Sequence, residues 1–118
     1  MTEDAAATVI RQAIGGDVDA IAWITAEADT TDTAVLIVMA ALLEQQPTRL
    51  DRAGAVASTS RDRQVVAIAR SHLGGERELV DALARDHLVD HPDSLIIAWV
   101  ASGAVVPPGP PGAGLSDS

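Results

Sequence analysis

The sequence has no cysteine and almost no aromatic residues. Phenylalanine and tyrosine are also absent, so the aromatic side chains are Trp23 and Trp99 alone. The lack of cysteine excludes disulfides, thiol catalysis and thiolate metal sites. Hydrophobic residues still make up 47% of the 118 residues, enough for one domain with a real core. That core must be built from Ala, Leu, Ile and Val, which favours close-packed helices over a sandwich or barrel.

Positive charge is scarce, and lysine is absent. All eight basic residues are arginines, against 17 acids, for a net charge of −9. Binding to nucleic acids and anionic membranes depends on neutralising phosphates, so this balance argues against both partners. Residues 45–75 hold five arginines and only two acids. This segregation predicts either a solvated helix pair that complements its acidic neighbours or a docking patch for an acidic partner. The five are Arg49, Arg52, Arg61, Arg63 and Arg70.

A membrane-spanning segment is not expected. Residues 34–43 form a run of ten apolar residues, which is too short for the roughly 20 that a bilayer requires. Residues 1–4 include two acids and lack the basic start of a signal peptide. We therefore expect a soluble, cytoplasmic protein.

Glycines and prolines divide the chain into six or seven short helices. Gly15-Gly16 and Gly74-Gly75 are expected to close helices, because glycine readily adopts the left-handed conformation found at helix ends. Pro47 and Pro92 provide further stops. Residues 48–58 form the weakest candidate, because Gly54 and a Ser/Thr-rich run interrupt them. The other predicted helices cover about 2–14, 17–28, 33–45, 61–73, 76–89 and 93–102.

Two stretches of the chain read alike. At a shift of 59 positions Arg11 matches Arg70, each glycine pair matches the other, and acids follow both pairs. At a shift of 61, residues 33–36 match 94–97. We therefore predict an all-α fold with two pseudo-repeated helix-GG-helix-helix units, about 2–46 and 60–103. Such stacked units usually present surfaces to partners. Residues 104–118 are predicted to be a disordered Pro/Gly tail of polyproline II character.

The second unit resembles a tetratricopeptide repeat. Gly75-Glu76 supplies the glycine-acid pair of the hairpin, a helix follows, and Pro92 stands where the next repeat opens. The resemblance implies stacked helical hairpins that bind proteins. The chain departs from the family where Ile68 replaces a glycine and Val80 a small residue, as Val9 and Ile21 do in the first unit. This bulk would push the paired helices apart.

The histidines suggest a metal site only weakly. His87 and His91 are four residues apart, a spacing that places two imidazoles on one helical face beside Asp86 and Asp90. His91 precedes Pro92, however, and is expected to leave the helix. Histidines also favour the negative C-terminal ends of helices without any metal. We assign no catalytic, cofactor-binding or metal-binding residues, because no catalytic motif is present and the acids fall mostly at helix starts.

The sequence predicts a protein-interaction or assembly module that is not an enzyme and needs no cofactor. Its partner would be another protein or a second copy. The helix around 36–43 is apolar on nearly all sides, which requires either a central position in the fold or contact with another protein. The predicted contact surface combines Arg49, Arg52, Arg61, Arg63 and Arg70 with Trp99. The alternative is a small ligand- or metal-binding helical enzyme with a site between the two pseudo-repeats. A third reading, a nucleic-acid regulator using 48–73 as a helix-turn-helix, is disfavoured by the net charge.

Overall fold

The computed structural model describes residues 3–103, and all regular structure in that range is α-helical. The all-α prediction is therefore confirmed, and the predicted tail lies outside the described residues. None of the described helices is long and apolar enough to cross a membrane. The seven helices are α1 (Glu3–Ile14), α2 (Val18–Glu27), α3 (Ala34–Glu44), α4 (Arg49–Val56), α5 (Ser60–Leu73), α6 (Arg77–Asp90) and α7 (Leu95–Ala101).

The two glycine pairs form the same turn. Gly16 and Gly75 have φ angles of +94° and +78°, the left-handed region that glycine adopts without strain. In the first turn, the amides of residues 15, 16 and 17 donate to the carbonyls of residues 11, 13 and 12. In the second, the amides of 74, 75 and 76 donate to those of 70, 72 and 71. Each bond recurs at a shift of 59 positions, as the sequence alignment does.

Helix α4 is more complete than expected. The interruption predicted around Gly54 does not occur, and the helix extends over Arg49–Val56. Its stability comes from packing, because Leu50 and Ala53 are fully buried against the core. Gly54 is exposed and leaves room for a side chain. Burial of one face thus outweighs the low helix propensity of a single glycine.

The C-terminal end of α3 differs from the prediction. At its N-terminal end the N-cap is Thr33, whose backbone amide donates to the Thr31 hydroxyl. At the other end the helix stops before Pro47, at Gln45, which has a φ of +54°. A left-handed residue turns the chain out of the helix. Proline is therefore not the residue that terminates α3.

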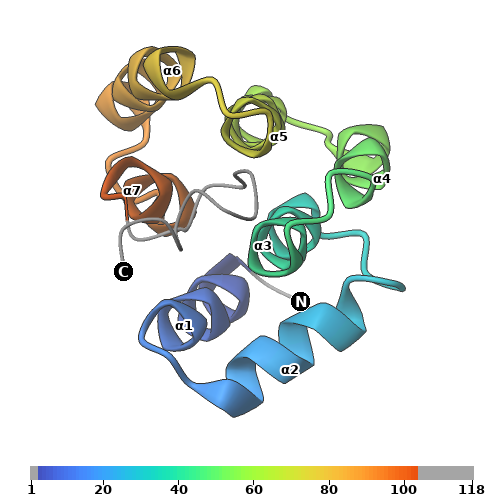
Figure 1. The fold of residues 1–118 in the computed structure, drawn as a ribbon. Coiled ribbons are helices and arrows are strands. Elements are labelled where there is room, and N and C mark those ends of the chain that lie inside the picture. Colours follow the sequence, from blue (N-terminus) through green and yellow to red (C-terminus); the bar gives the residue numbers. More distant parts are fainter. Residues whose placement is uncertain (1–2, 104–118) are drawn as a thin grey trace, which may run out of the picture.

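Helix α3 lies at the centre of the domain. It packs against α1, α2, α4 and α5, which surround it in Figure 1. Every residue from Leu36 to Leu42 is buried. The chain itself therefore covers the helix that is apolar on all sides. Of the two explanations for a helix that is apolar on nearly all sides, a central position or contact with another protein, the structure shows the central position, because four neighbouring helices enclose α3.

Helices α2 and α6 lie on opposite edges of this arrangement. Each directly follows a glycine turn, and each packs mainly against its two nearest neighbours: α1 and α3 for α2, α5 and α7 for α6. In Figure 1, α2 runs lengthwise across the lower edge, and α6 lies at the upper left. Each of the two helices therefore has a side directed away from the core.

Candidate functional site

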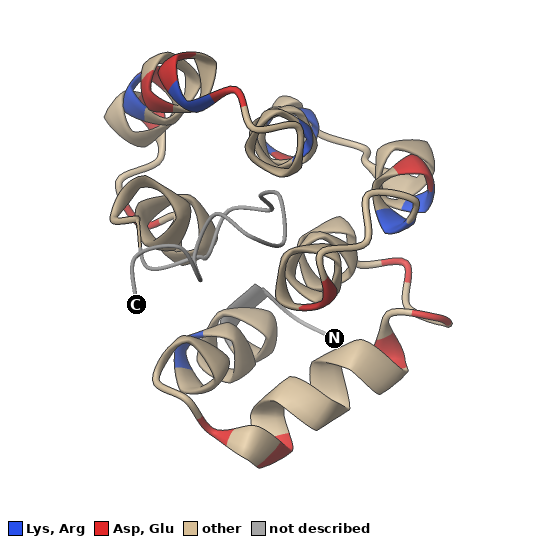
Figure 2. Ribbon diagram, in the orientation of Figure 1, with Lys and Arg blue, Asp and Glu red and all other residues tan. Residues whose placement is uncertain are grey.

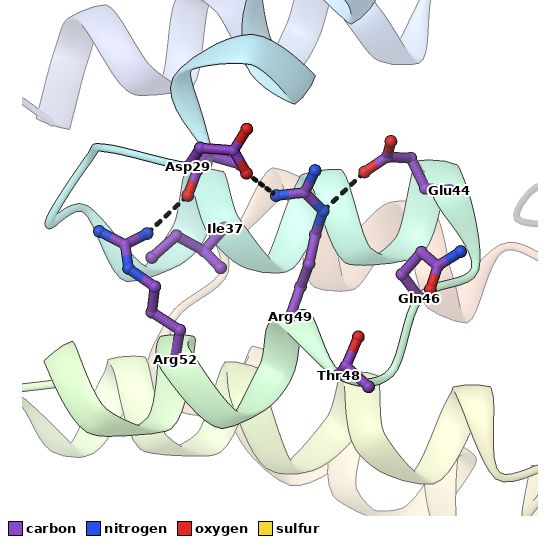
Figure 3. A pocket seen from close by; sticks show the side chains of 8 residues that line it. Asp29, Ile37, Glu44, Gln46, Thr48, Arg49 and Arg52 are labelled. Carbon is purple, nitrogen blue, oxygen red and sulfur yellow. Dashed lines mark hydrogen bonds and ion pairs between the residues drawn. The ribbon is translucent and has the colours of Figure 1, made fainter.

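The arginines of α4 bind groups of the chain itself. Arg49 contacts the Asp29 carboxylate at 3.0 Å and the Glu44 carboxylate at 2.6 Å, as Figure 3 shows. Arg52 donates to the backbone carbonyls of Ala28 and Thr31, each at 2.5 Å. These carbonyls lie at and just beyond the C-terminal end of α2, which carries negative partial charge. The two arginines therefore fasten α4 to the end of α2.

Two arginines of α5 are engaged in the same way. Arg70 contacts the Asp51 carboxylate and the Leu50 carbonyl, both at 3.3 Å. Arg61 lies 3.4 Å from Asp93, in the loop before α7. Arg63 is exposed, and it forms no ion pair with the described part of the chain. Four of the five arginines predicted to bind a partner thus join elements of the domain, and the fifth, Arg63, faces solvent.

A shallow hollow of about 520 Å³ lies beside Arg49 and Arg52. Ile37 forms part of its wall, and Asp29, Glu44 and both arginines line its edge (Figure 3). The charged groups of opposite sign face one another across the hollow and neutralise one another. These contacts join α3, α4 and the C-terminal end of α2.

A second cavity lies between the two predicted units. It measures about 310 Å³ and is lined by α1 and by the N-terminal ends of α3, α5 and α7. This is the place where the alternative hypothesis puts a ligand site. Its charged lining groups are Arg61, which pairs with Asp93, and the aspartates at positions 32 and 62. The lining combines apolar side chains with these charges.

His87 is a buried link between three helices. Its Nδ1 lies 2.7 Å from the Gln64 amide oxygen, and its Nε2 lies 3.0 Å from the Ser94 hydroxyl. Burial lowers the pKa of His87, and the positive charges of His91 and Arg61 lower this pKa further. Asp90 and Asp93 act in the opposite direction. The ring is therefore neutral near pH 7, with both nitrogens occupied.

The geometry of the histidines does not assemble a metal site. The rings of His87 and His91 lie 4.9 Å apart at 41°, but the nitrogens of His87 already face Gln64 and Ser94. His91 is the C-cap of α6, as its place before Pro92 predicts. Among the described residues, no cluster of three or more potential metal ligands occurs. The third histidine, His72, is buried with its Nε2 unpaired.

The outer side of α2 is unusually apolar. We define the α2 outer face as Val18, Asp19, Ala22, Trp23 and Ala26, all of which are exposed. Val18 is 76% exposed and Trp23 37%. Four of these five side chains are hydrophobic, whereas a solvated helix face is normally polar. Trp99, the aromatic side chain predicted to contact a partner, is instead half-buried and packs against the core.

The five aligned positions of α6 are mostly charged, although α6 exposes Leu79 and Val89 at other positions. The glycine turns place the aligned positions at Arg77, Glu78, Asp81, Ala82 and Arg85, which are likewise exposed. Val18, Ala22 and Ala26 of α2 thus correspond to two arginines and an aspartate. Sequence reasoning missed the α2 outer face, although the alignment of residues 18–26 with 77–85 contains the signal.

The fold defines an all-α domain of seven helices over the described residues. Comparison with known proteins adds no closer relationship: no family model, no curated protein and no solved structure matches the chain. The tetratricopeptide resemblance stays a prediction that rests on the sequence and on the repeated turn.

Proposed function

We propose that this protein is a helical interaction module without catalytic activity of its own, and that it docks a partner protein through the α2 outer face. The observation that carries the proposal is the contrast between the five aligned outward positions, of which four are apolar in α2 and four are charged in α6. An exposed apolar patch is costly in water and is typical of a binding surface. Trp23 provides the kind of large aromatic side chain that anchors protein interfaces.

The repeated glycine turn supports the tetratricopeptide-like part of the proposal. Two helical hairpins with the same turn are what a duplicated unit produces, and stacked repeats commonly present extended surfaces to partner proteins. The arginine cluster has a different role in this proposal. The arginines at positions 49, 52, 61 and 70 contact the chain itself and therefore hold the module together. We assign the partner surface to the α2 outer face instead.

The test replaces apolar residues of α2 with those found at the aligned positions of α6. The double variant Ala22→Asp/Ala26→Arg, called the α2-polar variant, changes exposed residues only. Its matched control is Ala82→Asp/Val89→Arg on α6, which adds the same charges at other exposed positions. Both variants should fold with unfolding free energies within about 1 kcal/mol of the wild type, because surface substitutions have small effects.

Quantitative affinity capture from a lysate then compares wild type, α2-polar variant and control. We expect proteins captured by the wild type to be retained by the control and reduced at least about tenfold with the α2-polar variant, because a charge must be desolvated in the interface. Equal capture by both variants, with both folded by circular dichroism, contradicts docking through α2.

A further inference from the structure

The α2 outer face is framed by negative charge. Asp17 and Asp19 lie at its N-terminal end and Glu27 at its C-terminal end. Figure 2 shows acids at both ends of α2 and uncharged residues between them. None of these three carboxylates forms an ion pair with the described part of the chain. Asp17 caps α2 through the amides of Asp19 and Ala20, so the apolar stripe has Asp19 and Glu27 as the acids available at its two ends.

The spacing of this frame suits a helical partner. Asp19 and Glu27 are eight residues apart, or about 12 Å along the helix axis. Ala22 and Ala26, one turn apart between them, are small enough to let another helix approach to the short interaxial distance of about 8 Å. Trp23 stands beside these alanines as an exposed anchor. The face thus matches about two turns of an amphipathic helix.

Charge decides between the possible occupants. A second copy docked symmetrically through α2 would place Asp19 and Glu27 against the same acids, in a protein of net charge −9. The segment 104–118 carries Asp117 and no basic residue, so it offers no complement to the frame. An anionic membrane surface would be repelled in the same way. The complementary occupant carries lysine or arginine on either side of an apolar stripe.

We infer that the α2 outer face receives a cationic amphipathic helix of a partner protein, with apolar side chains on Ala22, Trp23 and Ala26 and basic side chains beside Asp19 and Glu27. This inference rests on the proposed docking role of α2 and names the chemistry of the partner. Electrostatic complementarity of this kind mainly sets selectivity and the rate of association.

Trp23 provides the readout. The full chain with Trp99→Phe retains Trp23 as its single tryptophan, in a sequence without tyrosine. Three synthetic amphipathic peptides share one leucine stripe and carry lysine, glutamine or glutamate beside it. We expect the lysine peptide to shift the Trp23 emission to shorter wavelength and to bind about fivefold more tightly than the glutamine peptide, the scale of two exposed ion pairs. The difference should shrink in 0.5 M NaCl, where screening is strong.

Controls separate this site from general attraction to an acidic protein. Asp19→Arg/Glu27→Arg should reverse the preference toward the glutamate peptide, whereas Asp81→Arg/Asp86→Arg on α6 should retain the wild-type order. Equal affinity for all three peptides overturns the inference. Self-association of the wild type that is lost in the α2-polar variant, measured by light scattering, also overturns it, because the occupant is then a second copy.

The two proposals can fail separately. If the α2-polar variant loses captured proteins while the lysine peptide shows no advantage, the docking role stands and the cationic partner is wrong. If the α2-polar variant captures the same proteins as the wild type, the docking role itself fails.

Discussion

Helices α2 and α6 begin from the same turn and then diverge. Both follow a left-handed glycine with matching hydrogen bonds, so their inward and outward positions correspond. The five aligned outward positions are mostly apolar in α2 and mostly charged in α6. One inward position is occupied by Ala28 in the first half. Its counterpart in the second half, 59 residues later, is His87. A shared turn therefore fixes the direction of each helix but leaves its two faces free to serve different purposes.

The third helices of the two halves differ in their surroundings. Helix α3 packs against four other helices, whereas α7 packs against α1, α5 and α6. Ala40 in α3 is fully buried, and its counterpart 61 residues later, Ala101, is exposed. The difference comes from α4, which covers α3 and has no equivalent after α7 among the described residues.

The largest expected effect compares the same substitution in these two helices. Ala40→Asp buries an unpaired carboxylate, which costs several kcal/mol. Because domains of this size are stable by only about 5–15 kcal/mol, we expect the variant to be largely unfolded. Ala101→Asp places the charge in water at a helix C-terminus and should cost about 1 kcal/mol or less. Urea unfolding followed by circular dichroism measures both, and similar stabilities of the two variants would contradict the difference in enclosure.

The second prediction concerns pH and belongs to the second half alone. Burial lowers the folded-state pKa of His87 and of His72, and Arg77 lowers that of His72 further. In the unfolded chain a histidine pKa is about 6.5, so the unfolded state takes up protons first as the pH falls. The stability contributed by the neutral rings is complete above about pH 6.5 and decreases below it, toward the lower folded-state pKa.

Urea unfolding at pH 7.5 and 5.5 tests this prediction. The wild type should be less stable at pH 5.5, and His72→Gln/His87→Gln should have a smaller pH dependence. At pH 7.5, His87→Gln alone should cost about 1–2 kcal/mol, because the bonds to Gln64 and Ser94 are disturbed. Ala28, the aligned residue of the first half, offers no titrating group. A stability that does not change between the two pH values contradicts the assignment.

The sequence predicted the helices well because their signals are local. Gly16, Gly75 and the N-cap Thr59 act within one turn, and the observed ends agree with the predicted ones to within about two residues. The arginine contacts were not predictable in this way. Arg49 meets Asp29 and Arg70 meets Asp51 across about twenty residues, and only the packing of α4 decides these pairs. The enclosure of α3 likewise depends on helices that the periodicity of its own residues does not reveal.

The smallest expected effect distinguishes the caps of α2 and α6. The Asp17 carboxylate accepts from the amides of Asp19 and Ala20 at 2.9 and 3.1 Å, whereas Glu76 makes no side-chain cap bond. Asp17→Ala should therefore cost about 1 kcal/mol, and Glu76→Ala less than about 0.5 kcal/mol. Glu76→Asp shortens the side chain to capping length and should add about 0.5 kcal/mol if the two turns are equivalent. Thermal and urea unfolding measure the stability of all three variants. Equal costs of the two alanine substitutions would contradict this difference between the halves.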